Sequence, residues 1–200
     1  MEKGRLEAFT DGVIAVVITI MVLELKPPHE ATFAALLANW PVFVSYVLSF
    51  VYVGIYWNNH HHLMHFVEHV NGKVMWANLH VLFWISLFPL TTAWLNEAHG
   101  AQGEFPASVP TLVYGVVLLM TALAWIPLAN SLIRCNGGHA GTLARALGSG
   151  WKEKISPVVY LAAIALAFFA PIVSCVLYAA VAIIWVVPDR RIERHVMPNP

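Results

Sequence analysis

The chain has 200 residues, of which 59% are apolar and only 11% are charged. A soluble domain carries about 25% charged residues. This composition and a mean hydropathy of +0.69 therefore exclude an ordinary water-soluble globule and a disordered chain. The formal net charge is zero with the histidines neutral, which gives no sign of nucleic-acid binding, and two cysteines cannot build a disulfide framework. The composition predicts an all-α integral membrane protein.

Six apolar stretches are predicted to cross a bilayer, because a membrane helix needs about 20 mainly apolar residues. A short helix is expected over residues 30–38, before the second span, and Pro89 is expected to kink the third span. Residues 157–187 carry no charge and are too long for one crossing, so we expect a break around Pro171. The expected spans, within a single channel domain of residues 1–200, are 9–25, 41–57, 74–95, 109–129, 157–170 and 172–187.

The basic residues are distributed unevenly between the two ends of these spans. With six spans, one side holds only Lys26. The side with both termini holds Lys3, Arg5, Lys73, Arg134, Arg145, Lys152, Lys154, Arg190, Arg191 and Arg194. Since cytoplasmic loops carry the excess of lysine and arginine in membrane proteins, this pattern predicts that both termini are cytoplasmic.

The first span opens with an acidic residue, Asp11. A carboxylate at the bilayer centre costs about 2.5 to 3.5 kcal/mol, and less near the end of a span. One interpretation is an interfacial aspartate that caps the helix beside Thr10. The other is a structural anchor that pairs with Arg5 or with a neighbouring helix.

An aliphatic stripe follows on the same helix. At about 100° per residue, Val16, Ile20 and Leu23 fall within an arc of about 60°, Thr19 borders it, and Asp11 points roughly the opposite way. Such a stripe is commonly a packing face. Stripes on symmetry-related helices can also meet on an axis, where they form a hydrophobic constriction that gates by dewetting. The periodicity alone leaves both interpretations open.

Three elements of the sequence follow the motifs of one known family. The start of the first helix resembles the family signature RxxxFSDG, with threonine in place of serine, at Arg5, Phe9, Thr10, Asp11 and Gly12. Two further elements, at the end of the second helix and on the third, are similar to family patterns: Trp57-x-x-His60-His61, and Asn78-Leu79 with Phe88-Pro89. Together these motifs resemble the transmembrane protein 175 family of potassium channels.

The resemblance implies a six-span, bacterial-type subunit that assembles as a homotetramer in the cell inner membrane, with the pore on the fourfold axis. It implies a potassium-favouring cation channel that is not an enzyme, has no resident cofactor and lacks the TVGYG filter. By spacing from Asp11, the pore residues fall on Val16, Ile20 and Leu23, and Thr19 matches a threonine associated with potassium preference. Its partners would be copies of itself and the lipid bilayer, and no nucleic acid is expected.

We expect Arg5 and Asp11 to lie outside the narrow part of such a pore. They would instead hold the first helix against the second through Trp57, His60 or His61. This is a hypothesis of a structural network.

A histidine cluster at the end of the second span supports an alternative function. The spacing of four would place His61, His65 and His69 on one helical face, where imidazoles can bind zinc or copper. The alternatives are therefore a secondary transporter or divalent-metal carrier, a haem protein that uses His80, a pH sensor, or a merely solvated cluster. Enzyme functions lack support, since the chain has no phosphate loop, HExxH or GxSxG.

Overall fold

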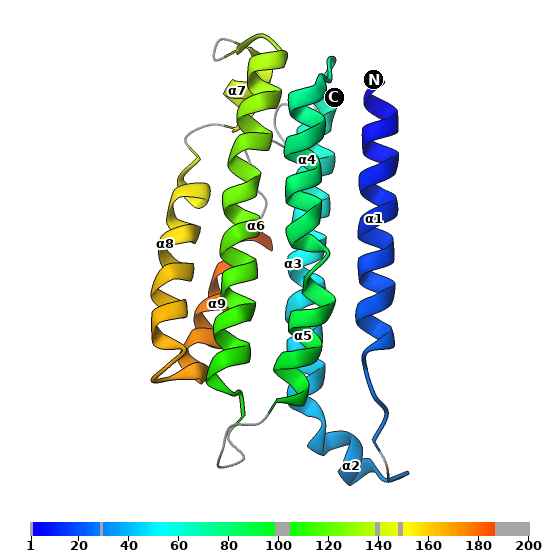
Figure 1. Cartoon of the computed structure of the whole chain (residues 1–200), viewed down its shortest axis with the longest axis vertical. Coiled ribbons are helices and arrows are strands. Elements are labelled where there is room, and N and C mark those ends of the chain that lie inside the picture. The colour runs from blue at the N-terminus through cyan, green and yellow to red at the C-terminus, as the bar shows by residue number, and fades with distance from the viewer. Residues whose placement is uncertain (1, 29, 99–104, 139–140, 148–149, 187–200) are drawn as a thin grey trace, which may run out of the picture.

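The computed structural model describes residues 2–28, 30–98, 105–138, 141–147 and 150–186 (Figure 1). Within these ranges every regular element is a helix, which confirms the predicted all-α class. The helices are α1 (Lys3–Leu23), α2 (Phe33–Ala38), α3 (Trp40–His65), α4 (Gly72–Ile85), α5 (Phe88–Glu97), α6 (Ser108–Cys135), α7 (Thr142–Leu147), α8 (Trp151–Leu166) and α9 (Pro171–Val186).

The long helices run up and down along one common direction, as Figure 1 shows. Helix α1 forms one edge of the bundle and packs against α3, α4 and α5. Helix α6 packs against α4, α5 and α8, and the α8–α9 hairpin forms the opposite edge. The start of α1, the start of α4 and the end of α6 lie at one end of the bundle, and α2 lies at the other.

Four helical segments are long and apolar enough to cross a membrane, judged by length and composition. They are Lys3–Leu23, Trp40–His65, Gly72–Glu97 and Ser108–Cys135. Helices α8 and α9 have 16 residues each, or about 24 Å at 1.5 Å per residue, which is less than a hydrocarbon core of about 30 Å. In the described part of the chain, length therefore supports four of the six expected spans.

Proline residues lie at two of the breaks between helices. Helix α4 ends at Ile85 and α5 begins at Phe88, with Pro89 in its first turn. A proline lacks the amide hydrogen and its ring collides with the carbonyl four residues earlier, here that of Ile85, so the break falls where the kink is expected. Pro171 likewise opens α9 after a break.

The helix ends differ from the expected span ends. Helix α1 begins six residues before position 9, α3 continues to His65, and α8 begins at Trp151 rather than at 157. Charged and polar residues stop a segment from crossing lipid but do not stop it from being helical, so the helices extend beyond their apolar stretches. The end of the sixth span at 187 and the basic residues Arg190, Arg191 and Arg194 lie outside the described residues.

Hydroxyl groups connect the helices inside the bundle. The Ser49 hydroxyl on α3 lies 2.7 Å from Thr92 Oγ1 on α5 and 2.9 Å from the Tyr114 hydroxyl on α6. The Tyr52 hydroxyl on α3 donates to the Tyr178 carbonyl on α9 over 2.6 Å. Buried polar groups without partners are costly, so these pairs restrict how the helices can be arranged.

We predict that Gly115→Ala destabilises the bundle, because α6 closely approaches α8 and α9 at this residue. An added Cβ would lie 2.7 Å from Tyr178 Cζ and 2.9 Å from Ile164 Cγ1, and the Tyr178 side chain is fully buried. Overpacking of this kind costs about 1–3 kcal/mol. The measurement is the thermal unfolding midpoint of the purified protein in detergent.

Gly54→Ala on α3 is the matched control, because no atom lies within 4 Å of its added Cβ. Alanine is the better helix former, so this variant should be at least as stable as the parent. Equal midpoints for the two variants would contradict close packing at Gly115.

Candidate functional site

The stripe on α1 lies on the exposed side of the helical bundle. Val16, Ile20 and Leu23 are 55%, 41% and 79% exposed, and Thr19 between them is exposed as well. The opposite side is buried against α3, α4 and α5, through Leu6, Thr10, Ile14, Val17 and Met21. The bundle therefore buries one face of α1 and leaves the aliphatic stripe for lipid or for another chain.

Thr19 is the polar member of the stripe. Its hydroxyl donates to the Val16 carbonyl at 2.8 Å, a local bond that a helix can make with its own preceding turn. A hydroxyl has one donor and two acceptor lone pairs. Because the hydrogen is directed to the helix, the oxygen is left to face outward as an acceptor, which is the form that a cation can bind.

The residues of the opening motif join α1 to α3. Trp57 Nε1 on α3 donates to Asp11 Oδ1 over 3.0 Å, and the Trp57 ring stacks on His61 with centroids 6.0 Å apart. Asp11 thus pairs with a neighbouring helix. The alternative, that Asp11 caps the helix, is wrong, because α1 begins at Lys3 and Asp11 lies in its third turn.

A second, fully buried bond joins α1 to α4. Asn78 Nδ2 donates to Thr10 Oγ1 over 2.8 Å, and both residues are buried. The Asn78 side chain also lies beside the imidazole of buried His60 from α3. Three helices therefore meet at one polar junction, formed by Thr10, Asp11, Trp57, His60 and Asn78.

Sequence reasoning noted Asn78 as part of a pattern but missed its role as the partner of Thr10. The available signal was an amide within an otherwise apolar span, because such a group must find a partner. The remaining motif residues lie away from the junction: Arg5 and Phe9 are exposed, and Arg5 makes no side-chain hydrogen bond or ion pair with another described residue. Gly12 is exposed on α1 with open space around it.

The histidine cluster does not form a metal site in the described residues, where no group of three metal-binding side chains lies together. The rings of His61 and His65 meet edge to face with centroids 4.8 Å apart. The expectation that His69 shares their helical face is wrong, because α3 ends at His65. His69 instead belongs to the following segment, where its amide donates to Asn136 Oδ1 over 2.9 Å.

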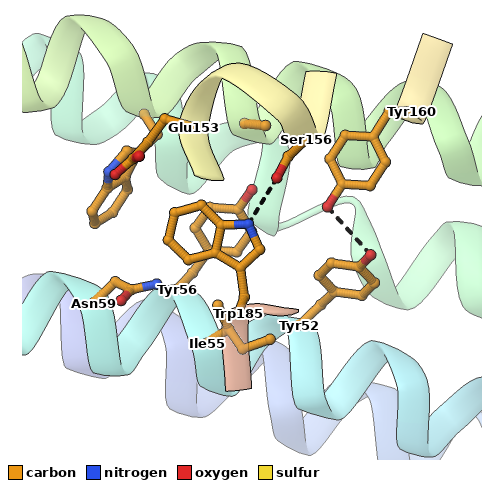
Figure 2. A pocket seen from close by; sticks show the side chains of 10 residues that line it. Tyr52, Ile55, Tyr56, Asn59, Glu153, Ser156, Tyr160 and Trp185 are labelled. Atoms are coloured by element: carbon orange, nitrogen blue, oxygen red, sulfur yellow. Dashed lines mark hydrogen bonds between the residues drawn. The ribbon is translucent and has the colours of Figure 1, made fainter. Parts of the chain in front are cut away.

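A small cavity lies inside the subunit, between α3, α6, α8 and α9 (Figure 2). Aromatic side chains form much of its wall, and two hydrogen bonds join lining residues: Trp185 Nε1 donates to Ser156 Oγ over 2.8 Å, and the Tyr160 hydroxyl donates to that of Tyr52 over 3.2 Å. Its volume is about 20 Å³, enough for about one water molecule. This cavity is too small to pass a hydrated ion.

Comparison with known proteins identifies the family. The chain is 49% identical over 199 residues to a potassium channel from Chryseobacterium sp. (strain P1-3), and the match covers 100% of both chains. The family model described as endosomal/lysosomal potassium channel TMEM175 matches residues 5–89. The chain belongs to the TMEM175 family. The matched segment begins at Arg5 of the opening motif and ends at Pro89.

A solved structure and a further sequence relative also match the chain. The crystal structure of a lysosomal potassium-selective channel TMEM175 homologue from Chamaesiphon minutus matches with a TM-score of 0.77 and 28% identity, over 94% of this chain and 97% of that chain. The endosomal/lysosomal proton channel TMEM175 of Danio rerio is 30% identical over 120 residues, which cover 54% of this chain and 23% of that protein.

We predict that Thr10→Val weakens the attachment of α1, because it leaves a buried amide donor of Asn78 without its acceptor. Such a loss costs about 1–3 kcal/mol. Thr10→Ser keeps the hydroxyl and should restore stability. The measurement is thermal unfolding in detergent, together with the oligomeric state by size-exclusion chromatography and light scattering.

Thr19→Val is the matched control, since it removes the same hydroxyl from the exposed face of the same helix. Its unfolding midpoint should stay near that of the parent. A Thr10→Val protein as stable as the parent would show that the junction does not hold α1.

Proposed function

We propose that the chain is the subunit of a homotetrameric, potassium-favouring cation channel in a bacterial inner membrane, with the first helices around a central ion path. The observation that carries the proposal is the exposed α1 stripe of Val16, Thr19, Ile20 and Leu23. The junction on the other side of α1 holds the helix in the rotation that turns this stripe outward.

The spacing of the stripe suits a short hydrophobic constriction. At 1.5 Å per residue, Val16 and Leu23 lie about 10 Å apart along the helix, which is about a third of a hydrocarbon core of about 30 Å. Four copies around an axis would stack rings of valine, isoleucine and leucine over this distance. Apolar rings in a narrow pore oppose the entry of hydrated ions and gate by dewetting.

Thr19 supplies the polar component of the same path. Its hydroxyl hydrogen is engaged by the Val16 carbonyl, so four such oxygens around an axis would present lone pairs to a cation. Oxygen atoms can replace part of the hydration shell of potassium. This arrangement favours a cation over an anion and makes Thr19 the residue that tunes preference among cations.

The close packing inside the subunit also supports an ion path at the α1 face. The internal cavity between α3, α6, α8 and α9 has a volume of about 20 Å³, room for about one water, and much of its wall is aromatic. The Ser49 hydroxyl is hydrogen-bonded to those of Thr92 and Tyr114 across the bundle. These tightly paired groups support an ion path outside the single bundle, between subunits.

The permeant ion is tested first, because the relatives bear the names of potassium and of proton channels. Purified protein in potassium-loaded liposomes should release potassium passively, without a coupling ion, and more readily than sodium. Currents in planar bilayers should reverse near the potassium equilibrium potential. Flux of zinc or of protons without potassium would reject the proposal, and protein-free liposomes give the baseline.

The position of the path is tested by cysteine substitution in a background with Cys135 and Cys175 replaced by alanine. Val16→Cys should make the potassium current sensitive to a water-soluble methanethiosulfonate reagent, because its side chain would face the pore. Val17→Cys is the matched control. The Val17 side chain is buried inside the subunit, so a cysteine there should be protected from the reagent. An unmodified Val16→Cys current would assign the stripe to lipid or to packing.

A further inference from the structure

A groove lies between the first turns of α4 and the last turns of α6. Figure 1 shows that these two helix ends lie at the same end of the bundle. It is open to the outside and has a volume of about 790 Å³. Its lining is Asn71, Gly72, Lys73, Trp76, Ala77 and His80 from the α4 side, with Pro127 and Ser131 from α6. The groove is separate from α1 and from the junction that holds it.

The end of the groove nearest the start of α4 is polar and basic. Lys73 contributes an ammonium group and Ser131 a hydroxyl, and none of the described residues that line the groove is acidic. Arg134 is exposed one helical turn beyond Ser131. Trp76 is 76% exposed, and an exposed indole beside a basic residue is typical of the level of lipid headgroups.

His80 adds a hydrogen-bond donor one turn deeper. The Trp84 Nε1–H, which can only donate, is bonded to His80 Nε2 at 3.0 Å, so Nε2 acts as the acceptor. In a neutral imidazole the other nitrogen then carries the hydrogen. Nδ1–H is thus the donor that His80 can offer to an oxygen-rich ligand.

Beyond His80 the two helices present apolar side chains. Phe83 on α4, three residues beyond His80, and Leu123 on α6, four residues before Pro127, are both exposed. The helices therefore present basic and hydrogen-bonding groups at the bundle end, followed by exposed apolar surface toward the middle. This order matches the headgroup and acyl chains of a phospholipid.

We propose that this groove binds an anionic phospholipid from the leaflet at this end of the bundle. Lys73 would meet the phosphate, Ser131 and His80 Nδ1 would donate to phosphate or ester oxygens, and Trp76 would lie at the headgroup level. The acyl chains would follow Phe83 and Leu123. The excess of positive charge selects an anionic headgroup over a zwitterionic one.

The test measures binding of phosphatidylglycerol and phosphatidylcholine to the purified full-length protein in detergent by native mass spectrometry. We expect phosphatidylglycerol to bind more tightly. Lys73→Gln should weaken phosphatidylglycerol binding about five-fold, the effect of about one basic residue near a membrane surface. Trp76→Leu should weaken the binding of both lipids, because it removes contacts that do not depend on charge.

Lys154→Gln is the matched control, since Lys154 is an exposed lysine in the first turn of α8 and does not line the groove. It should leave phosphatidylglycerol binding near the parent value. Three outcomes would overturn the proposal: equal binding of the two lipids, an equal loss in both lysine variants, or displacement of the lipid by soluble glycerol phosphate at millimolar concentration. The last would indicate a free-anion site. The measurement does not depend on ion conduction.

Discussion

The rotation of α1 about its own axis depends on the polar junction beneath it. A residue step turns a helix by about 100°, so a small change of register would exchange its exposed and buried faces. The Thr10–Asn78 bond holds one side of α1 on α4, and the Trp57–Asp11 bond holds an adjacent side on α3. Because these bonds need particular atoms, they specify the orientation that aliphatic packing alone would leave loose.

The same division of roles between specific polar bonds and apolar packing appears throughout the bundle. Apolar contacts supply little preference for one helix arrangement over another in lipid, since lipid tails are as apolar as leucine. Specific pairs such as Ser49 with Thr92, and Tyr52 with the Tyr178 carbonyl, select the arrangement instead. Gly115 adds a steric condition, because α6 approaches the hairpin too closely for any side chain.

Much of the candidate site was predictable, for identifiable reasons. The aliphatic stripe follows from helical periodicity, and the interruptions at Pro89 and Pro171 follow from the missing amide of proline. The histidine spacing was misleading, because periodicity assumes a continuous helix and α3 ends before His69. Hydropathy likewise located the apolar part of α8 but not its charged first turn.

By itself, the sequence determined the class of the protein, the apolar segments, the breaks between them and which residues of the first helix share a face, because each of these depends on local composition or on spacing along one helix. Only the tertiary structure decided which face of α1 is buried, that Asn78 is the partner of Thr10, and that α4 and α6 enclose a basic groove. These features depend on contacts between helices far apart in the chain, and no local pattern specifies which helices become neighbours.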